Sequence, residues 1–134
     1  MTRRVVLGVV LLHLTIAAIS AQTLQSRPRS RDWLAPASES GKVNPLASRS
    51  ETAAGGRKLF SQRCSTCHGD DGRGSERAPD LSASDLQAQT DGALFWKISN
   101  GNTRSGMPAF SFLPEPQRWQ LILHLRGPVR GAVE

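Results

Sequence analysis

Hydrophobic residues in the second half of this 134-residue chain recur at helical spacing. Apolar side chains three or four residues apart, with polar residues between them, are typical of helices that bury one face. This pattern covers the stretches from Ser50 to about Cys64, from Asp91 to Ser99 and from Pro116 to Gly127. No stretch alternates apolar and polar residues as a half-buried strand does. The pattern therefore predicts an all-α domain over residues 50–134.

Residues at the ends and on the faces of these stretches sharpen the prediction. Gly101 follows the middle stretch as a helix stop signal, and Pro116 suits the first turn of the last helix. Gly56 and Phe60 lie four residues apart and share one face of the first helix. Trp119, Ile122, Leu123 and Arg126 recur at helical spacing in the last helix, and we expect Trp119 to lie in the core against the first helix.

The first 49 residues follow a different pattern. Arg3 and Arg4 precede an apolar run from Val5 to Ile19, and small residues follow it, which is the layout of a secretory signal peptide. We expect residues 1–21 to be this signal peptide. The apolar run is short for a membrane span, and an uncleaved N-terminal anchor is the alternative. Residues 22–49, rich in Ser, Arg and Pro, predict a flexible linker or an arm on the domain surface.

The expected signal peptide predicts the compartment in which the protein acts. It predicts export to the periplasm, with contact to the inner membrane only if the leader is not cleaved. Trp33 and Leu34 form an apolar spot in the linker. For this spot we favour a local contact with the domain over a docking site for a partner.

The net charge of +6 is unevenly distributed. Residues 51–134 hold ten basic and nine acidic side chains, so the predicted domain is nearly neutral and the leader and linker carry the basic excess. No basic stripe with interleaved aromatic residues occurs, and such a stripe is typical of nucleic-acid binding. We therefore expect no nucleic-acid partner.

The chain has two cysteines, Cys64 and Cys67, and His68 follows them directly. A Cys-x-x-Cys-His run is typical of c-type haem attachment, because two thiols one helical turn apart can each form a thioether with one haem vinyl group. A structural zinc site needs four ligands, and the other histidines, His13 and His124, are isolated. A thioredoxin-like pair would lie in a βαβ pattern, which is not visible.

Met107 is the only methionine besides Met1. A thioether is a soft, neutral ligand that raises the potential of haem iron, and Gly106 and Pro108 would hold the backbone on either side. This favours Met107 as the second axial ligand, opposite the histidine. Two alternatives stay open: Met107 fills a gap in the core, or His124 takes the axial position.

From Ser50 to Gly127 the chain resembles class I c-type cytochromes, of the monohaem, bacterial periplasmic type. Residues 64–74 are similar to their attachment site and glycine-rich loop, and residues 106–110 to their axial-methionine segment. Residues 78–81, Ala-Pro-Asp-Leu, are similar to the segment whose proline carbonyl accepts a hydrogen bond from the axial histidine. The resemblance thus implies that Pro79 orients the histidine ring. In this family a glycine of the first helix lets the first and last helices cross closely, so the resemblance implies such a crossing at Gly55-Gly56. In relatives an aromatic residue often stands in the place of His124, where it meets the first helix.

The resemblance implies a small cytochrome c fold of three to four helices around one covalent haem c. Cys64 and Cys67 would form the thioethers, and His68 and Met107 would ligate the iron. The side chains expected to exclude water are Leu81, Leu94, Phe95, Ile98, Phe110 and Leu113.

The implied function is single-electron transfer rather than catalysis. The protein would act as a soluble carrier or an oxidoreductase subunit in a respiratory chain. Its donor would be a dehydrogenase or a quinol-oxidising complex, its acceptor an oxidase. It would be a monomer or a subunit. The alternative is a haem-based ligand sensor or a peroxidase with a labile sixth site.

Overall fold

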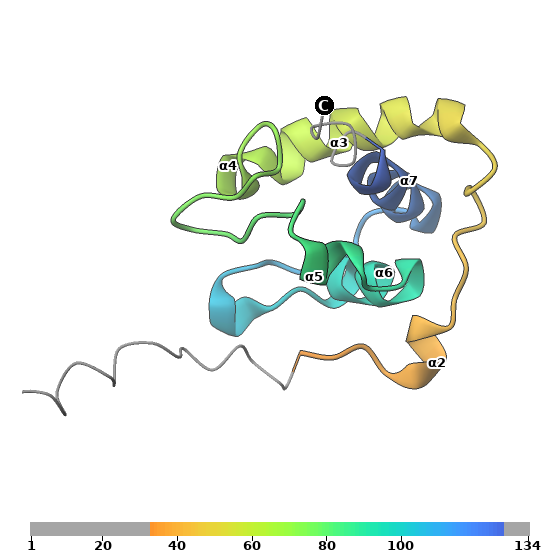
Figure 1. The fold of residues 1–134 in the computed structure, drawn as a ribbon, viewed down its shortest axis with the longest axis horizontal. Coiled ribbons are helices and arrows are strands. Elements are labelled where there is room, and N and C mark those ends of the chain that lie inside the picture. Colours follow the sequence, from red (N-terminus) through yellow and green to blue (C-terminus); the bar gives the residue numbers. More distant parts are fainter. Residues whose placement is uncertain (1–32, 128–134) are drawn as a thin grey trace, which may run out of the picture. The chain divides into compact units, whose positions relative to one another are not determined.

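Helices make up the regular structure of residues 33–127, the range that the computed structural model describes (Figure 1). The three helices longer than one turn are α3 (Ala53–Arg63), α6 (Asp91–Asn100) and α7 (Glu115–Arg126). The short segments are α2 (Ala37–Ser40), η1 (Ser50–Thr52), α4 (Ser65–His68), α5 (Ser84–Gln87) and η2 (Thr103–Ser105). Because this range contains no strand, the all-α prediction is confirmed.

Two expectations fall on residues outside this range. The expected signal peptide at residues 1–21 lies outside the described residues, and so does the linker up to residue 32. None of the helices within residues 33–127 combines the length and the hydropathy of a membrane span.

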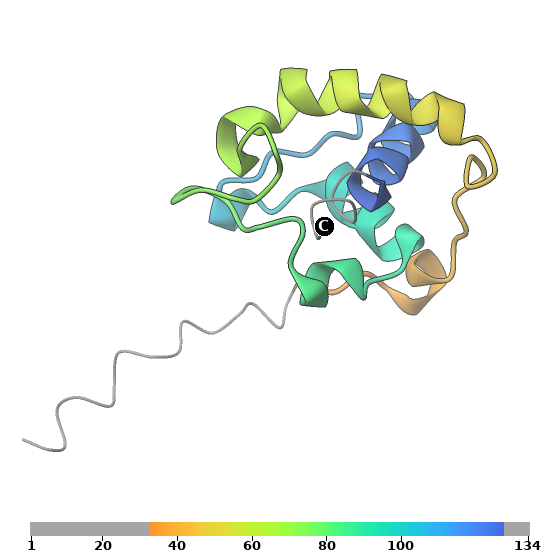
Figure 2. The ribbon, with the colours of Figure 1, turned by 45° about the horizontal axis from the view of Figure 1, so that its top comes forward.

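Helices α3 and α7 cross, as Figures 1 and 2 show from two directions. A Cβ atom on Gly56 would lie 1.9 Å from the backbone oxygen of Gln120 on α7. Only a glycine permits this approach, so the expected close crossing of the first and last helices is confirmed. The first helix differs slightly from the prediction, because Ser50 begins the single 3-10 turn η1 and the α-helix begins at Ala53.

The core consists of two neighbouring clusters of buried side chains. One cluster, called here the site cluster, comprises Phe60, Leu81, Phe110, Leu113, Leu121 and Leu125. The other joins α6 to α7 and comprises Leu94, Phe95, Trp119 and Ile122. The ring of Trp119 stacks on Phe95 with 4.0 Å between centroids and 19° between planes. Trp119 is thus a core residue, as expected, but its partners in this cluster lie on α6 rather than on the first helix.

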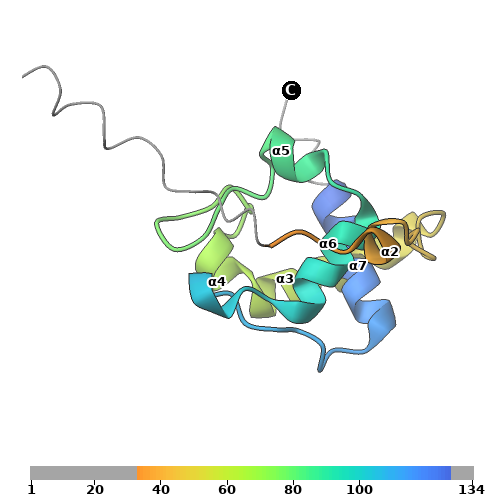
Figure 3. The ribbon, with the colours of Figure 1, turned by 90° about the horizontal axis from the view of Figure 1, so that it is seen from below.

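The chain before α3 lies against α6 and α7. The compact unit begins at Trp33, ahead of the boundary expected at residue 50. Helix α2 runs beside α6 (Figure 3), where a Cβ on Gly92 would lie 2.1 Å from the backbone oxygen of Glu39. The side chain of Asn44 is 2% exposed and donates a hydrogen bond to the backbone oxygen of Trp119.

Candidate functional site

The two cysteines stand on consecutive turns where α3 passes into α4. Cys64 terminates α3, and its backbone oxygen accepts hydrogen bonds from the N–H groups of Cys67 at 3.1 Å and His68 at 2.9 Å. The thiols are not joined in a disulfide; Cys64 is half-buried and Cys67 exposed. Burial, and secondarily Cys67, raise the pKa of Cys64 to about 11, so its free thiol stays protonated at neutral pH. A protonated thiol resists oxidation.

The ring of His68 is held at one nitrogen. Its Nδ1 lies 2.9 Å from the backbone oxygen of Pro79. Because a carbonyl oxygen only accepts, this contact requires the tautomer with the proton on Nδ1. Nε2 then carries the lone pair, and no group of residues 33–127 forms a hydrogen bond with it. His68 is thus oriented as a metal-ligating histidine is, with its second nitrogen bonded to an outer partner.

The loop between His68 and Pro79 folds back because it contains Gly74. Gly74 has a φ of +86°, and a Cβ there would lie 2.6 Å from the backbone nitrogen of Asp80. Its N–H donates to the backbone oxygen of His68 at 2.8 Å. Ser75 ties the same loop to the cysteines, since its hydroxyl donates to the backbone oxygen of Cys67. The glycine is therefore what lets the Pro79 carbonyl reach the histidine.

Met107 lies on a short hairpin loop that follows α6. Asn102 and Met107 exchange both backbone hydrogen bonds, at 2.9 and 3.0 Å, around η2. Gly101 makes the turn out of α6 with a φ of +64°, and a Cβ there would lie 2.5 Å from the carbonyl carbon of Pro108. The Phe110 N–H then bonds back to the Ile98 oxygen at 3.0 Å. The backbone on both sides of the methionine is thus fixed to the end of α6.

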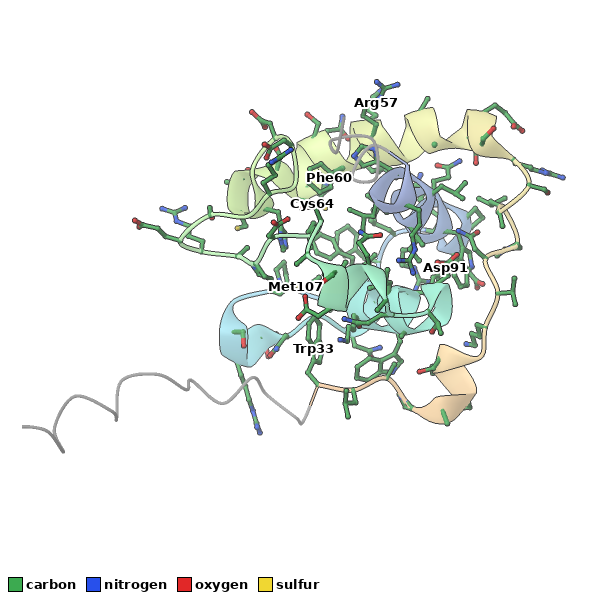
Figure 4. The ribbon with its side chains drawn as sticks, in the orientation of Figure 1. Trp33, Arg57, Phe60, Cys64, Asp91 and Met107 are labelled. Carbon is green, nitrogen blue, oxygen red and sulfur yellow. The ribbon has the colours of Figure 1, made fainter. Side chains whose placement is uncertain are left out.

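The cysteine and methionine segments meet at the site cluster. Cys64 and Met107 are both partly buried and both pack against it, as do Leu59, Leu86 and Ile98. Figure 4 labels these two residues, together with Phe60 of the cluster. Four of the side chains expected to exclude water from this region, Leu81, Phe110, Leu113 and Ile98, lie in or against the cluster. The fold thus brings to one apolar region residues that are far apart in sequence.

His124 lies elsewhere, at the crossing of α3 and α7. Its ring is 5.2 Å from that of Phe60, centroid to centroid, with the planes tilted by 55°. Burial and, secondarily, the Arg57 guanidinium hold the pKa of His124 below its ordinary value. These contacts agree with a packing role for His124.

Two supporting residues went unrecognised in the sequence. The short side chain of Ser75 in a glycine-rich loop was a usable signal, because serine commonly bonds to nearby backbone in turns. Trp33 donates from Nε1 to the backbone oxygen of Gly101 at 2.8 Å, beside the methionine loop. The sequence favoured a local contact for Trp33, but no periodicity pointed to this partner.

The residues of this region fit a covalently attached haem better than a bare metal ion. Residues 33–127 contain no group of three or more His, Cys, Asp or Glu side chains that could hold a metal. Cys64 and Cys67 are free thiols one turn apart, and His68 presents Nε2 on the same short helix. A thioether sulfur, that of Met107, adjoins the same apolar cluster as Cys64. This donor set is the one that c-type haem requires.

Comparison with known protein families gives one match. The family model for "Cytochrome C oxidase, cbb3-type, subunit III" matches residues 51–125, which is more than half of the chain and includes Cys64, Cys67, His68 and Met107. Searches of curated proteins and of solved structures gave no match. On the strength of this match and of the fold, the chain belongs to the cbb3-type cytochrome c oxidase subunit III family and contains a c-type cytochrome domain.

Proposed function

We propose that this protein is an exported monohaem cytochrome that passes single electrons between redox proteins. A cytochrome c domain implies a covalently bound haem c and electron transfer. Cys64 and Cys67 would hold the haem through thioethers, and His68 and Met107 would be the residues that ligate its iron. The observation that carries this proposal is the packing of Cys64 and Met107 against one apolar cluster.

The attachment segment prepares the histidine before any ligand binds. The Pro79 carbonyl, 2.9 Å from Nδ1, fixes both the tautomer and the direction of the His68 ring. A bonded Nδ1–H also makes Nε2 a stronger donor toward a metal. Each thiol would hold the haem through a thioether bond to one of its vinyl groups. The chain therefore supplies two covalent anchors and one pre-oriented ligand within a single turn.

The methionine segment supplies the other ligand and keeps water away. Its backbone pairing with Asn102 limits how far Met107 can move from the end of α6. Phe110 and Leu113, both 7% exposed, cover the same region with apolar side chains. The bound haem supplies an iron that alternates between the ferric and ferrous states. Because His68 and Met107 would both ligate that iron, no position would be open for a substrate, which favours electron transfer over catalysis.

We further propose that the acceptor is a terminal oxidase and the donor a dehydrogenase or quinol-oxidising complex. The family description names a subunit of a cbb3-type oxidase, which supports an oxidase partner for this chain. The basic leader followed by an apolar run supports export to the periplasm. Whether the chain acts free or within an oxidase complex can be tested by asking if it copurifies with oxidase subunits at native abundance.

The first test is an absorption spectrum of the full chain, exported with the c-type maturation machinery. We expect a haem that survives acid–acetone extraction and a red-edge charge-transfer band in the ferric protein. The spectrum of the reduced, ferrous protein should not change when carbon monoxide is added. Met107→Ala should keep the covalent haem, lose that band and bind carbon monoxide. A native protein that already binds carbon monoxide would instead indicate a ligand sensor or a peroxidase.

A second test concerns attachment. Replacing Cys64 and Cys67 together by Ser should abolish haem retention through extraction, because no thioether can form. Thr66→Ser is the matched control, since Thr66 lies exposed between the cysteines. Retention of haem by the double variant would overturn the assignment of the two cysteines.

A further inference from the structure

The chain from Trp33 to Leu46, called here the N-terminal strap, is anchored at three places. Trp33 Nε1 donates to the Gly101 oxygen at 2.8 Å, and the Ser40 oxygen accepts from the Thr90 hydroxyl at 2.7 Å. Asn44 Nδ2 donates to the backbone oxygen of Trp119 at 3.2 Å. The strap therefore spans the length of α6 and ends on α7.

The Trp33 anchor lies at the base of the methionine loop. Its acceptor, Gly101, directly precedes Asn102, which exchanges two backbone hydrogen bonds with Met107. Gly101 is buried, and its backbone lies so close to Pro108 that a Cβ on Gly101 would be 2.5 Å from the Pro108 carbonyl carbon. A shift of the Gly101 carbonyl would therefore be passed to the backbone on both sides of the methionine. Figure 4 labels Trp33 and Met107 in one view.

Lys97 of α6 lies over the face of the Trp33 indole. Lys97 Nζ lies 4.7 Å from the centroid of the Trp33 ring and donates to Gln89 Oε1 at 2.7 Å. A cation over the face of a tryptophan is attracted by the ring quadrupole. Trp33 is thus held by its edge to Gly101 and by its face to Lys97.

We propose that Trp33 is a positioning residue for the Met107 sulfur. Its hydrogen bond fixes the Gly101 carbonyl and so keeps the loop closed, with Met107 on the iron. This inference rests on the axial role proposed above for Met107. Without the Trp33 donor the loop opens more readily, and an exogenous ligand replaces the methionine more easily.

The strap itself supplies the matched control for a purely structural role. Asn44 anchors the same strap to α7, and its side chain is buried, but its partner lies outside the methionine loop. Asn44→Ala should lower the stability of the whole domain without changing ligand exchange at the iron. Trp33→Phe keeps an aromatic ring under Lys97 and removes only the N–H donor and the larger ring.

The experiment measures imidazole binding to the full-length, haem-loaded ferric protein, followed by loss of the methionine–iron charge-transfer band. We expect Trp33→Phe to raise the imidazole binding constant about fivefold, the ratio that loss of one ordinary hydrogen bond produces. Lys97→Gln should also raise the imidazole binding constant, but by a smaller factor. Asn44→Ala should leave the constant unchanged while lowering the denaturation midpoint, and Leu34→Ala, at a 71% exposed position, should change neither.

The outcomes separate the two proposals. A native protein without the charge-transfer band would overturn the axial role of Met107 and this inference with it. A native protein with the band, whose imidazole binding constant is the same in Trp33→Phe, would overturn the inference alone. An equal rise in Asn44→Ala and Trp33→Phe would also overturn it, because the strap would then act through overall stability. If the Trp33→Phe chain did not fold and the imidazole binding constant of Lys97→Gln were unchanged, the inference would also be overturned.

Discussion

The two sides of the proposed haem site are held in different ways. The attachment side, residues 64–81, draws its support from its own stretch of chain: the Cys64 oxygen, the Gly74 turn and the Pro79 carbonyl. The methionine side, residues 101–110, depends on contacts from elsewhere. Its loop is paired to the end of α6 and is bonded to Trp33, 68 positions earlier in the chain.

This difference indicates which of the two proposed iron ligands is released more easily. Local contacts re-form whenever the short segment folds, so the attachment side should tolerate loosening of the rest of the domain. The methionine side requires Trp33, the end of α6 and the loop to be in contact at once, and Trp33 is distant in sequence. We therefore expect changes to these particular contacts to release Met107 from the iron without disturbing His68.

The strongest change would disturb what both sides share, the crossing of α3 and α7. A Cβ on Gly56 would lie 1.9 Å from a backbone oxygen, so Gly56→Ala must force the two helices apart. We expect a loss of about 4 kcal/mol in the free energy of unfolding, above the usual cost of overpacking. Denaturant titration of the ferric haem protein measures it.

Gly55→Ala is the matched control for this prediction. A Cβ on Gly55 would meet only the end of the flexible Gln120 side chain, at 2.6 Å. Since alanine favours a helix over glycine by about 1 kcal/mol, this variant should be as stable as the native protein or more so. Equal destabilisation by the two variants would show that the close crossing is not what fixes the helices.

The next change acts on the attachment side alone. Gly74→Ala combines a φ of +86° with a Cβ 2.6 Å from the Asp80 backbone nitrogen. Strain and overlap together should cost about 3 kcal/mol and pull the Pro79 carbonyl away from His68. The yield of haem-attached protein should fall, and the axial histidine should show a changed ring orientation by paramagnetic NMR. Glu76→Ala, at an exposed position of the same loop, should leave both unchanged.

A smaller effect is expected on the methionine side from Gly101→Ala. The added Cβ would lie 2.5 Å from the Pro108 carbonyl, but the loop residues beyond it are largely exposed and can move outward. We expect about 2 kcal/mol of destabilisation, with loss of the methionine–iron band and full retention of covalent haem.

Gly106→Ala tests whether that loss comes from overlap or from backbone strain. Gly106 has a φ of +85°, but a Cβ there would meet nothing within 4 Å. Strain alone should cost about 1 kcal/mol and leave the band in place. If the two variants lost the band equally, the closeness of Gly101 to Pro108 would not be what holds Met107.

The same division explains how much could be predicted from the sequence. The Cys-x-x-Cys-His run is a local motif and could be read directly, and the contact of Pro79 with the histidine followed from the resemblance of residues 78–81 to a family segment. Helix α6 was also predictable, since Asp91 begins it and Gly101 ends it as expected. The partners of Trp33 and Trp119 were not, because a side chain's distant contacts depend on how helices pack. Periodicity shows which face of a helix is buried, and not which element covers it.

The smallest predicted effect concerns His124, which the sequence left as a competitor for the second axial position. Burial, with a smaller contribution from Arg57, lowers the pKa of His124 in the folded chain below its ordinary value of 6.5. As the pH falls through that value, the unfolded chain takes up the proton first. The folded state is then disfavoured, and its stability decreases toward low pH. Above about pH 7.5 both states are neutral at this position and the effect vanishes.

His124→Gln removes this titration and keeps a polar side chain against Phe60. The stability of the variant relative to the native protein should therefore improve between pH 7.5 and pH 5, measured by denaturant unfolding of both proteins. The two proteins differ at position 124 alone, so the difference between them isolates this side chain. The methionine–iron band should be the same in both proteins at every pH of the series. A native protein that lacks this band, and gains it in His124→Gln, would contradict the packing role and return His124 to the list of iron ligands.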